Sequence, residues 1–188
     1  MSYCDIAPDH PIHAPYHDAE YGFPVTDDAR LNERLALEVF QAGLSWLIVL
    51  KKRPAFYKAF RGFAPEKVAR FSTRDKARLM GDEGIIRNAR KIDAVIENSR
   101  RIRALAKTHG SFSGWLSAQH PRPKDDWVKL FREHFLFMGG EVVGEFLMST
   151  GYLPGAHAPS CPVYQQILAL DPPWRRNTTT RCKTAKSR

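Results

Sequence analysis

The sequence lacks any apolar run long enough to cross a membrane, and its first ten residues contain neither a basic nor an apolar segment typical of a signal peptide. It has only three cysteines among 188 residues, too few for a disulfide framework. It also lacks internal repeats, low-complexity stretches and the alternating pattern of strands. We therefore expect a cytoplasmic protein with reduced thiols, which either bind a metal or remain unliganded.

What the sequence does contain is a hydrophobic fraction of 43% and a formal net charge of +9. This length and composition predict one globular domain over residues 1–188, with a basic, flexible tail from about residue 172. Lysine and arginine are spread along the chain, which favours an anionic partner, most simply nucleic acid. A generally basic protein without such a partner is the alternative.

Hydrophobic periodicity predicts an all-α fold throughout. Pro54 is expected to end one helix and start another, Ser72 or Thr73 to cap a later helix, and Gly110 to end the longest one. The expected helices are 31–42, 45–52, 54–60, 66–71, 73–80, 92–105, a short one at 115–116, 125–135 and 142–148.

Glu38 lies within the apolar stripe of the helix expected at 31–42, on the same side as Leu35. A carboxylate in that position costs several kcal/mol unless a partner compensates for its burial. One interpretation is a structural ion pair with Arg34 or Arg30, the nearest basic residues. The other is a recognition carboxylate that faces a cationic or hydrogen-bond-donating ligand in an aromatic pocket.

Two cysteines and two histidines stand near opposite ends of the chain: Cys4, His17, His157 and Cys161. Two thiolates and two imidazoles can form a closed, electrically neutral, tetrahedral zinc site that would tie these ends together. Because the spacing is loose, His10 and His13 are alternative ligands, and Cys182 is a further thiol. Unliganded loop residues are the other interpretation.

The segment 80–91 joins two expected helices through a glycine-bearing turn, in the manner of a helix-hairpin-helix element. The backbone N–H groups of such a turn, with the N-terminus of the next helix, can hold a DNA phosphate. Arg87, Arg90 and Lys91 add positive charge there. An ordinary turn followed by a solvated basic face is the alternative.

Three aromatic residues could share a site with Glu38. Trp46 follows the turn 41–45, so it starts one helix where the helix of Glu38 has just ended, and both side chains can reach one ligand. Tyr16 precedes His17, so a metal that holds His17 would also fix Tyr16. Core packing is the alternative for both, and for Tyr21.

Taken together, these residues resemble the bacterial DNA-3-methyladenine glycosylase I family. The resemblance rests on residues 16–24, 37–38 and 41–53, then 84–88, 91–92 and the closing histidine and cysteine, all in the same order. It covers about residues 3 to 164, and the block 41–53 is its most specific part.

The resemblance implies a helix-hairpin-helix superfamily fold and a monomeric enzyme that hydrolyses the N-glycosidic bond of alkylated adenine in double-stranded DNA. By resemblance, Cys4, His17, His157 and Cys161 are structural zinc ligands, and Glu38 recognises the damaged base in catalysis. The implied base-pocket residues are Tyr16, Trp46 and Tyr21, the last at a position usually filled by tryptophan. The implied DNA-binding residues are Gly43, Leu44, Gly84, Ile85, Ile86, Arg87 and Lys91.

The chemistry of this reaction suits the residues. Methylation at N3 makes adenine cationic, so it departs easily and is bound by a desolvated carboxylate and electron-rich rings. Neither a dedicated catalytic aspartate nor a Schiff-base lysine can be placed from the sequence, and Asp125 and Asp126 fit a helix cap at least as well. We therefore expect a monofunctional glycosylase without lyase activity.

The chain also departs from the family pattern around the pocket. Ile6 stands where the family often has tryptophan, and Glu141 and Glu145 occur in a divergent segment, 137–145. The segment 151–157 is one residue longer than usual. These departures leave two alternatives: action on another alkylated base, or a non-enzymatic helix-hairpin-helix module that binds DNA.

Overall fold

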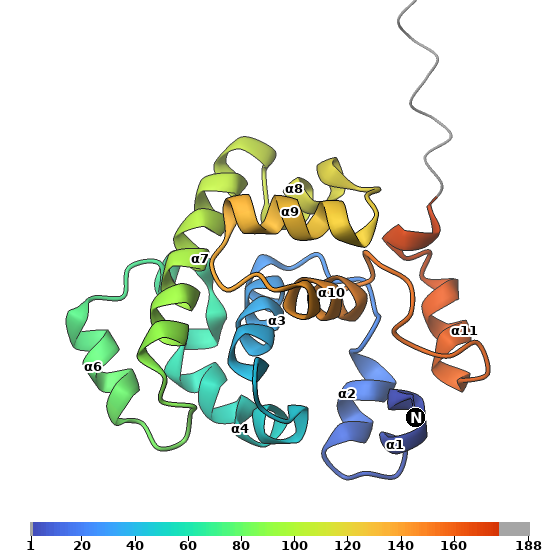
Figure 1. The fold of residues 1–188 in the computed structure, drawn as a ribbon, viewed down its shortest axis with the longest axis horizontal. Helices are drawn as coiled ribbons and strands as arrows, with labels where there is room; N and C mark the ends of the chain where they lie inside the picture. The colour runs from blue at the N-terminus through green and yellow to red at the C-terminus, as the bar shows by residue number, and fades with distance from the viewer. Residues whose placement is uncertain (1, 177–188) are drawn as a thin grey trace, which may run out of the picture.

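The computed structural model describes residues 2–176, and every regular element within them is a helix (Figure 1). The all-α prediction is therefore confirmed for this part of the chain. Within it, no helix combines the length and apolar character that a membrane span requires. The elements are α1 Tyr3–Ile6, α2 His13–Ala19, α3 Asp28–Gln41, α4 Trp46–Ala59, η1 Arg61–Phe63, α5 Pro65–Val68, α6 Thr73–Gly81, α7 Ala89–His109, α8 Phe112–Gln119, α9 Lys124–His134, α10 Gly140–Ser149, α11 Pro162–Ala169 and η2 Pro173–Arg175.

Helix α3 lies at the centre of the molecule, where it packs against α4, α7 and α10 (Figure 1). The helix predicted at 31–42 starts three residues earlier, because Asp27 caps it by accepting a hydrogen bond from the backbone N–H of Arg30. All ten residues 31–40 are buried. Any charged side chain in this stretch, including Glu38, is therefore removed from water.

The helix break predicted at Pro54 is wrong, because α4 runs without interruption from Trp46 to Ala59. Proline leaves the carbonyl of Leu50 without its helical donor, which costs about 3 kcal/mol. Beyond the proline, however, Phe56 is fully buried and Ala59 nearly so. Burying a phenylalanine side chain contributes about 1.5–3 kcal/mol, and continuing the helix keeps this packing.

Other helix ends follow the local rules in part. Ser72 caps α6 and Gly110 ends α7, as predicted. The helix expected at 66–71 stops at Val68, because the chain turns there to bury Phe71 in the core. Helix α10 begins two residues before the predicted start, and α1, α2 and α11 were not predicted at all.

The two ends of the described chain come together beside the central helices. Helices α1 and α2 lie next to the segment 157–161, which leads into α11 (Figure 1). At the start of the expected tail, Pro173–Arg175 forms η2, and the N–H of Trp174 donates to the carbonyl of Gly151. Residues 177–188 of that tail lie outside the described residues.

Candidate functional site

A cavity of about 550 Å³ lies between α1 and α2 on one side and α3, the start of α4, and α10 on the other. This volume is in the range of small-molecule sites. Its lining includes the four residues that the sequence analysis assigned to one pocket: Tyr16, Tyr21, Glu38 and Trp46. The structure thus brings together side chains from three separate parts of the sequence.

Glu38 is 4% exposed and lines this cavity. The ion pair considered for it is not formed among the described residues, because Arg34 donates to Glu20 at 2.6 Å and Arg30 lines a different cavity. Burial and, to a smaller extent, the charge of Glu145 raise the pKa of Glu38, and the charge of Arg34 lowers it, so that the pKa is about 8. A buried acid without a partner, facing a cavity, is typical of a ligand site.

Aromatic rings form the wall around Glu38. The ring centroids of Tyr16 and Trp46 are 5.2 Å apart at 61°, and those of Tyr16 and Tyr21 are 5.7 Å apart. The hydroxyl of Tyr16 is buried and has no hydrogen-bond partner among the described residues. Such groups are uncommon in folded proteins, so this hydroxyl is available to a ligand.

Tyr3 is a wall residue that the sequence analysis missed. Its ring centroid lies 5.3 Å from that of Tyr21, and its hydroxyl is 3.0 Å from Nδ1 of His13. The argument used for Tyr16 could have found it: Tyr3 precedes Cys4, so a metal bound to Cys4 also fixes Tyr3. Ile6, on the same short helix, lines the cavity and is 49% exposed.

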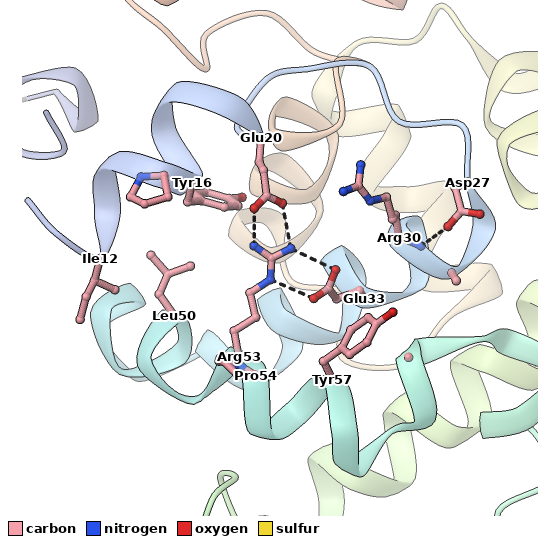
Figure 2. A pocket seen from close by; sticks show the side chains of 13 residues that line it. Ile12, Tyr16, Glu20, Asp27, Arg30, Glu33, Leu50, Arg53, Pro54 and Tyr57 are labelled. Carbon is pink, nitrogen blue, oxygen red and sulfur yellow. Dashed lines mark hydrogen bonds and ion pairs between the residues drawn. The ribbon is translucent and has the colours of Figure 1, made fainter.

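A second cavity, of about 760 Å³, lies behind Tyr16 and was not anticipated from the sequence (Figure 2). Arg53 crosses it, with hydrogen bonds of 2.7 and 2.8 Å to Glu20 and of 2.8 and 3.1 Å to Glu33. This cavity is larger than the first, but Arg53, Glu20 and Glu33 pair with one another. It therefore contains no unpaired buried carboxylate like that of Glu38. We therefore place the functional site in the smaller cavity.

The ion-pair network behind Tyr16 also supports that ring. The guanidinium carbon of Arg34 lies 4.5 Å from the centroid of the Tyr16 ring, and that of Arg53 lies 5.9 Å from it. Glu20 accepts hydrogen bonds from both arginines. The aromatic wall beside Glu38 is therefore fixed from the side opposite the cavity.

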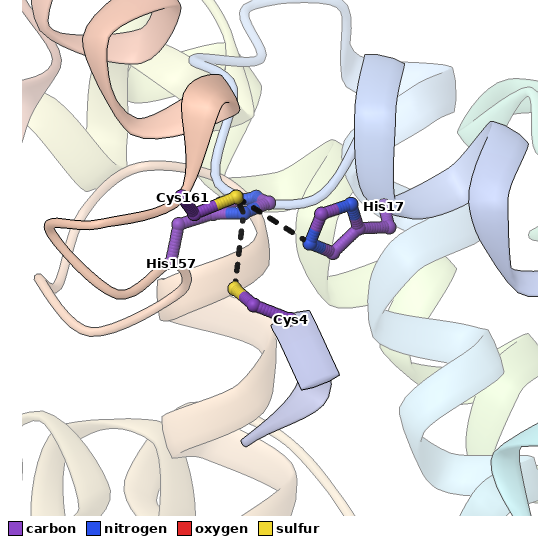
Figure 3. A group of neighbouring side chains, drawn as sticks. All are labelled: Cys4, His17, His157 and Cys161. Carbon is purple, nitrogen blue, oxygen red and sulfur yellow. Dashed lines mark hydrogen bonds between the residues drawn. The ribbon is translucent and has the colours of Figure 1, made fainter. Parts of the chain in front are cut away.

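Cys4, His17, His157 and Cys161 converge at one point, as the sequence predicted (Figure 3). Their ligand atoms all lie within 4.8 Å of one another. Sγ of Cys161 is 3.5 Å from Nδ1 of His157 and 3.8 Å from Nε2 of His17, and Sγ of Cys4 is 3.6 Å from Nδ1 of His157. This group could hold a metal ion.

The outer nitrogens of both histidines also have partners. Nδ1 of His17 lies 2.7 Å from the carboxylate of Asp18, and Nε2 of His157 lies 2.8 Å from the carbonyl oxygen of Tyr21. Such contacts orient an imidazole toward a metal. Of the alternatives, His10 accepts hydrogen bonds from the N–H groups of Ile12 and His13, and Cys182 lies outside the described residues.

The turn after α3 borders the mouth of the cavity. Gly43 has φ +82°, a conformation that favours glycine, and Leu44 next to it is 37% exposed. The side chain of Gln41 donates to the carbonyl of Leu44 at 3.0 Å, which closes the turn. An apolar side chain is therefore held out beside the pocket.

The segment 82–88 joins α6 to α7 and lies against α4. A Cβ at Gly84 would stand 3.0 Å from Cβ of Ala55, which is closer than most Cβ contacts, so a larger residue at this position would require Ala55 to shift by a few tenths of an ångström. Ile85 is buried, Ile86 packs against the core, and Arg87 is exposed. Lys91, by contrast, is buried, and its ammonium group bonds to backbone carbonyls at the end of α3.

Asp125 and Asp126 lie in the first turn of α9 and do not line the cavity. Asp126 pairs with Lys129 at 3.2 Å on the surface. The helix cap considered for them is wrong, because Pro123 occupies the N-cap position; both aspartates instead lie within the first turn, where the helix dipole favours a negative charge.

Comparisons with known proteins agree with this geometry. Residues 6–129 match the family model described as methyladenine glycosylase. The chain is 32% identical over 178 residues to a DNA-3-methyladenine glycosylase of Haemophilus influenzae, covering 85% of this chain and 96% of that one. It is 46% identical over 100 residues to DNA-3-methyladenine glycosylase 1 of Escherichia coli, covering 53% of this chain and 54% of that one.

A solved structure shares most of the architecture. The structure of 3-methyladenine DNA glycosylase I from Staphylococcus aureus, which concerns recognition of 3-methyladenine by that protein, matches with a TM-score of 0.77. The two chains are 32% identical, and the match covers 87% of this chain and 96% of that one.

Proposed function

The chain belongs to the methyladenine glycosylase family, and on this premise we propose that it hydrolyses the N-glycosidic bond of 3-methyladenine in double-stranded DNA. The observation that carries the proposal is the unpaired, buried carboxylate of Glu38 in an aromatic cavity. The chain has a net charge of +9, yet among the described residues no lysine or arginine lines this cavity. The cavity thus favours a cation that the rest of the protein would repel.

Charge explains how such a cavity selects the damaged base. Methylation at N3 leaves the base of the nucleotide positively charged, whereas undamaged adenine is neutral. A desolvated carboxylate and the faces of Tyr16, Tyr21 and Trp46 attract the cation through ion pairing and cation–π contact. Extruding the base from the duplex costs a few kcal/mol, and less where damage has weakened its pairing.

The same charge makes the bond easy to break. When the bond between N9 and C1′ breaks, its electron pair stays with the base, which leaves as neutral 3-methyladenine. Water adds to C1′ and releases a proton to solvent. No protein nucleophile takes part in this scheme, so Glu38 acts by holding the cationic base, and the enzyme is monofunctional without lyase activity.

We assign the DNA-facing surface to the turn after α3 and the segment between α6 and α7. Leu44, exposed beside the cavity, has the position to fill the gap left by the flipped nucleotide. The backbone of 84–86 and the side chain of Arg87 can contact phosphates, in the manner of a helix-hairpin-helix element. Lys91 does not contact phosphates in this proposal, because its ammonium group bonds to carbonyls at the end of α3. It instead supports the DNA-facing surface from inside the protein.

The cysteine and histidine cluster fits zinc. Neighbouring sulfur and nitrogen ligands of a tetrahedral zinc ion stand about 3.6 Å apart, and the three sulfur–nitrogen distances in Figure 3 are 3.5 to 3.8 Å. Two thiolates neutralise the dication, and four protein ligands leave no open position. Zinc held by Cys4, His17, His157 and Cys161 would have a structural role, fixing the helices that carry Tyr3 and Tyr16.

The decisive experiment is to incubate the protein with methylated double-stranded DNA and identify the free bases released. We expect release of 3-methyladenine, and a strong loss of release in Glu38→Gln, which keeps the size of the side chain and removes its charge. Glu66→Gln is a matched control, since Glu66 is exposed in α5, and it should release base as the wild type does. Folded protein that binds methylated duplex without releasing base would be a DNA-binding module instead.

A further inference from the structure

Helix α10 brings a second carboxylate to the cavity, and the function proposed above does not use it. Glu145 lines the cavity together with Glu38 and is partly exposed. The hydroxyl of Tyr21 donates a hydrogen bond to Oε2 of Glu145 at 3.0 Å, so the orientation of this carboxylate is fixed. Among the described residues Oε1 has no partner, and the nearby Lys124 pairs with Glu141 instead. Oε1 can therefore accept a hydrogen bond from a molecule in the cavity.

Three acidic side chains mark three depths of this cavity. Glu141, in the first turn of α10, is 89% exposed and lies at the rim. Glu38 is buried at the inner end. Glu145, one turn along α10 from Glu141, has an intermediate exposure. A flipped nucleotide whose base reaches Glu38 keeps its phosphates outside the cavity, so its sugar lies at the intermediate depth.

The other carboxylates of the cavity and its imidazole are less suited to act on a water molecule beside that sugar. Glu38 is engaged with the base itself, and Glu141 faces solvent. Burial and the charge of His10 lower the pKa of His13, which makes this imidazole a weaker base. In addition, Nδ1 of His13 lies 3.0 Å from the hydroxyl of Tyr3. None of the three combines a strong base with the depth of the sugar.

The surroundings of Glu145 suit a group that accepts a proton. Burial raises the pKa of its carboxyl group; the hydroxyl of Tyr21 lowers it, Glu141 raises it and Lys124 lowers it, with a raised pKa as the result. Glu38, across the cavity on α3, interacts with the same charge. A carboxylate whose pKa lies closer to the working pH is a more effective base than an ordinary one.

Resting on the function proposed above, we propose that Glu145 is the general base of the reaction, which accepts a proton from the water that attacks C1′. The bond between N9 and C1′ breaks, and its electron pair leaves with the base. The oxygen of the water bonds to C1′, and Oε1 of Glu145 takes the proton and later passes it to solvent. Glu38 thus holds the base, and Glu145 activates the water.

The test separates catalysis from binding. Single-turnover release of 3-methyladenine from methylated duplex DNA is measured against enzyme concentration, which gives a rate constant at saturation and a half-saturating concentration. In Glu145→Gln, which keeps an acceptor for Tyr21, the rate constant should fall by about 100-fold, at the lower end of what a general base contributes. The half-saturating concentration should change by about twofold or less, because the interaction forms in the transition state. An unchanged rate constant would show that the proposal is wrong.

Glu141→Gln is the matched control. It removes a charge from the same helix one turn away, but the Glu141 side chain is exposed and lies beside Lys124. Solvent screens such a charge, so the rate constant at saturation should stay within about twofold of the wild type. An equal fall in both variants would overturn the proposal in favour of the general charge of α10.

Azide separates proton transfer from packing. It is an anion that bonds to C1′ without losing a proton, so it needs no general base. In Glu145→Ala, sodium azide should restore base release and leave a deoxyribose with azide at C1′, whereas sodium chloride at the same concentration should do neither. Folded Glu145→Ala that azide does not rescue would show that the side chain acts through packing, against the proposal. Failure of the proposed function is a separate result, since wild-type protein would then release no base from methylated DNA.

Discussion

The ammonium group of Lys91 lies 2.6 Å from the carbonyl oxygen of Ala42, across 49 residues of sequence. A second bond, of 2.9 Å, joins it to the carbonyl of Phe40. The positive charge therefore caps the C-terminus of α3, where the helix dipole is negative. Because Lys91 follows the segment 82–88 and Ala42 precedes the turn at Gly43, the two loops assigned to DNA contact are held as one unit.

Replacing Lys91 by methionine should therefore affect both stability and DNA binding. The change leaves one buried and one partly buried carbonyl without the ammonium donor, and the free energy of unfolding should fall by about 1–3 kcal/mol. Urea denaturation measures this. Arg90→Met is the control, because Arg90 is exposed: it should weaken duplex binding in a salt-dependent way and leave stability unchanged. Equal stability of the two variants would show that the hydrogen bonds of Lys91 do not stabilise the two loops.

The raised pKa of Glu38 predicts a pH dependence of base release. The ionised carboxylate binds a cation, and the ionised fraction grows as the pH rises through the pKa of about 8. We expect kcat/KM to increase up to about pH 8 and then level off, since this parameter reports ionisation in the free enzyme. The increase should be absent in Glu38→Gln. A wild-type profile that is flat from pH 6 to 9 would contradict the assignment.

The raised pKa of Glu38 also predicts that the stability of the fold decreases with rising pH, whereas the activity increases. The folded protein keeps the proton of Glu38 between the ordinary pKa of 4.5 and about 8, where the unfolded chain has lost it. The contribution of Glu38 to the free energy of unfolding therefore decreases as the pH rises through this window. Denaturation at pH 5 and pH 9 should show that Glu38→Gln is more stable than the wild type only at the higher pH.

Metal analysis tests the cysteine and histidine cluster. We expect about one zinc ion per chain in protein purified without chelator, and a large loss of thermal stability when the ion is removed. His157→Ala should lose the metal. His10→Ala should retain it, because His10 bonds to backbone N–H groups away from the cluster. Metal-free protein of unchanged melting temperature would refute the structural role.

Leu44 should matter for duplex DNA in particular. Filling the gap left by a flipped nucleotide stabilises the extruded state only where a duplex has been opened. In Leu44→Ala we expect base release from duplex DNA to fall on the order of tenfold relative to release from single strands. Ile48→Ala, which also removes an exposed apolar side chain but from the first turn of α4, should leave this ratio unchanged.

The charge network behind Tyr16 makes a further prediction. Arg53→Met would leave the side chains of Glu20 and Glu33 without their shared partner, and Glu33 is 6% exposed. Breaking a buried pair in this way costs about 3–5 kcal/mol, measured as the free energy of unfolding. Lys51→Met, two residues earlier in α4 and exposed, should cost little. Similar losses in the two variants would show that the network adds no stability.

Local features of the sequence were sufficient for much of the fold, whereas the residues of the metal cluster were assigned through the family resemblance. The cap at Ser72, the end of α7 at Gly110 and the position of Glu38 on its helix depend on neighbouring residues, so periodicity and residue type predict them. Residue type identified the cysteines and histidines as possible metal ligands, but it left His10, His13 and Cys182 as alternatives. The roles of the site residues, and the helix-hairpin-helix assignment, stay predictions until the experiments above are done.

Only the tertiary structure decided how the charges are paired. Arg34 was a candidate partner of Glu38 from its place one turn earlier, but it bonds to Glu20 on another helix. Lys91 was expected at the DNA surface and is buried instead, and α4 continues through Pro54 because packing beyond it offsets the lost hydrogen bond. The sequence by itself determined which groups must be satisfied. Packing chose their partners, because these contacts join residues far apart in the chain and local patterns carry no information about them.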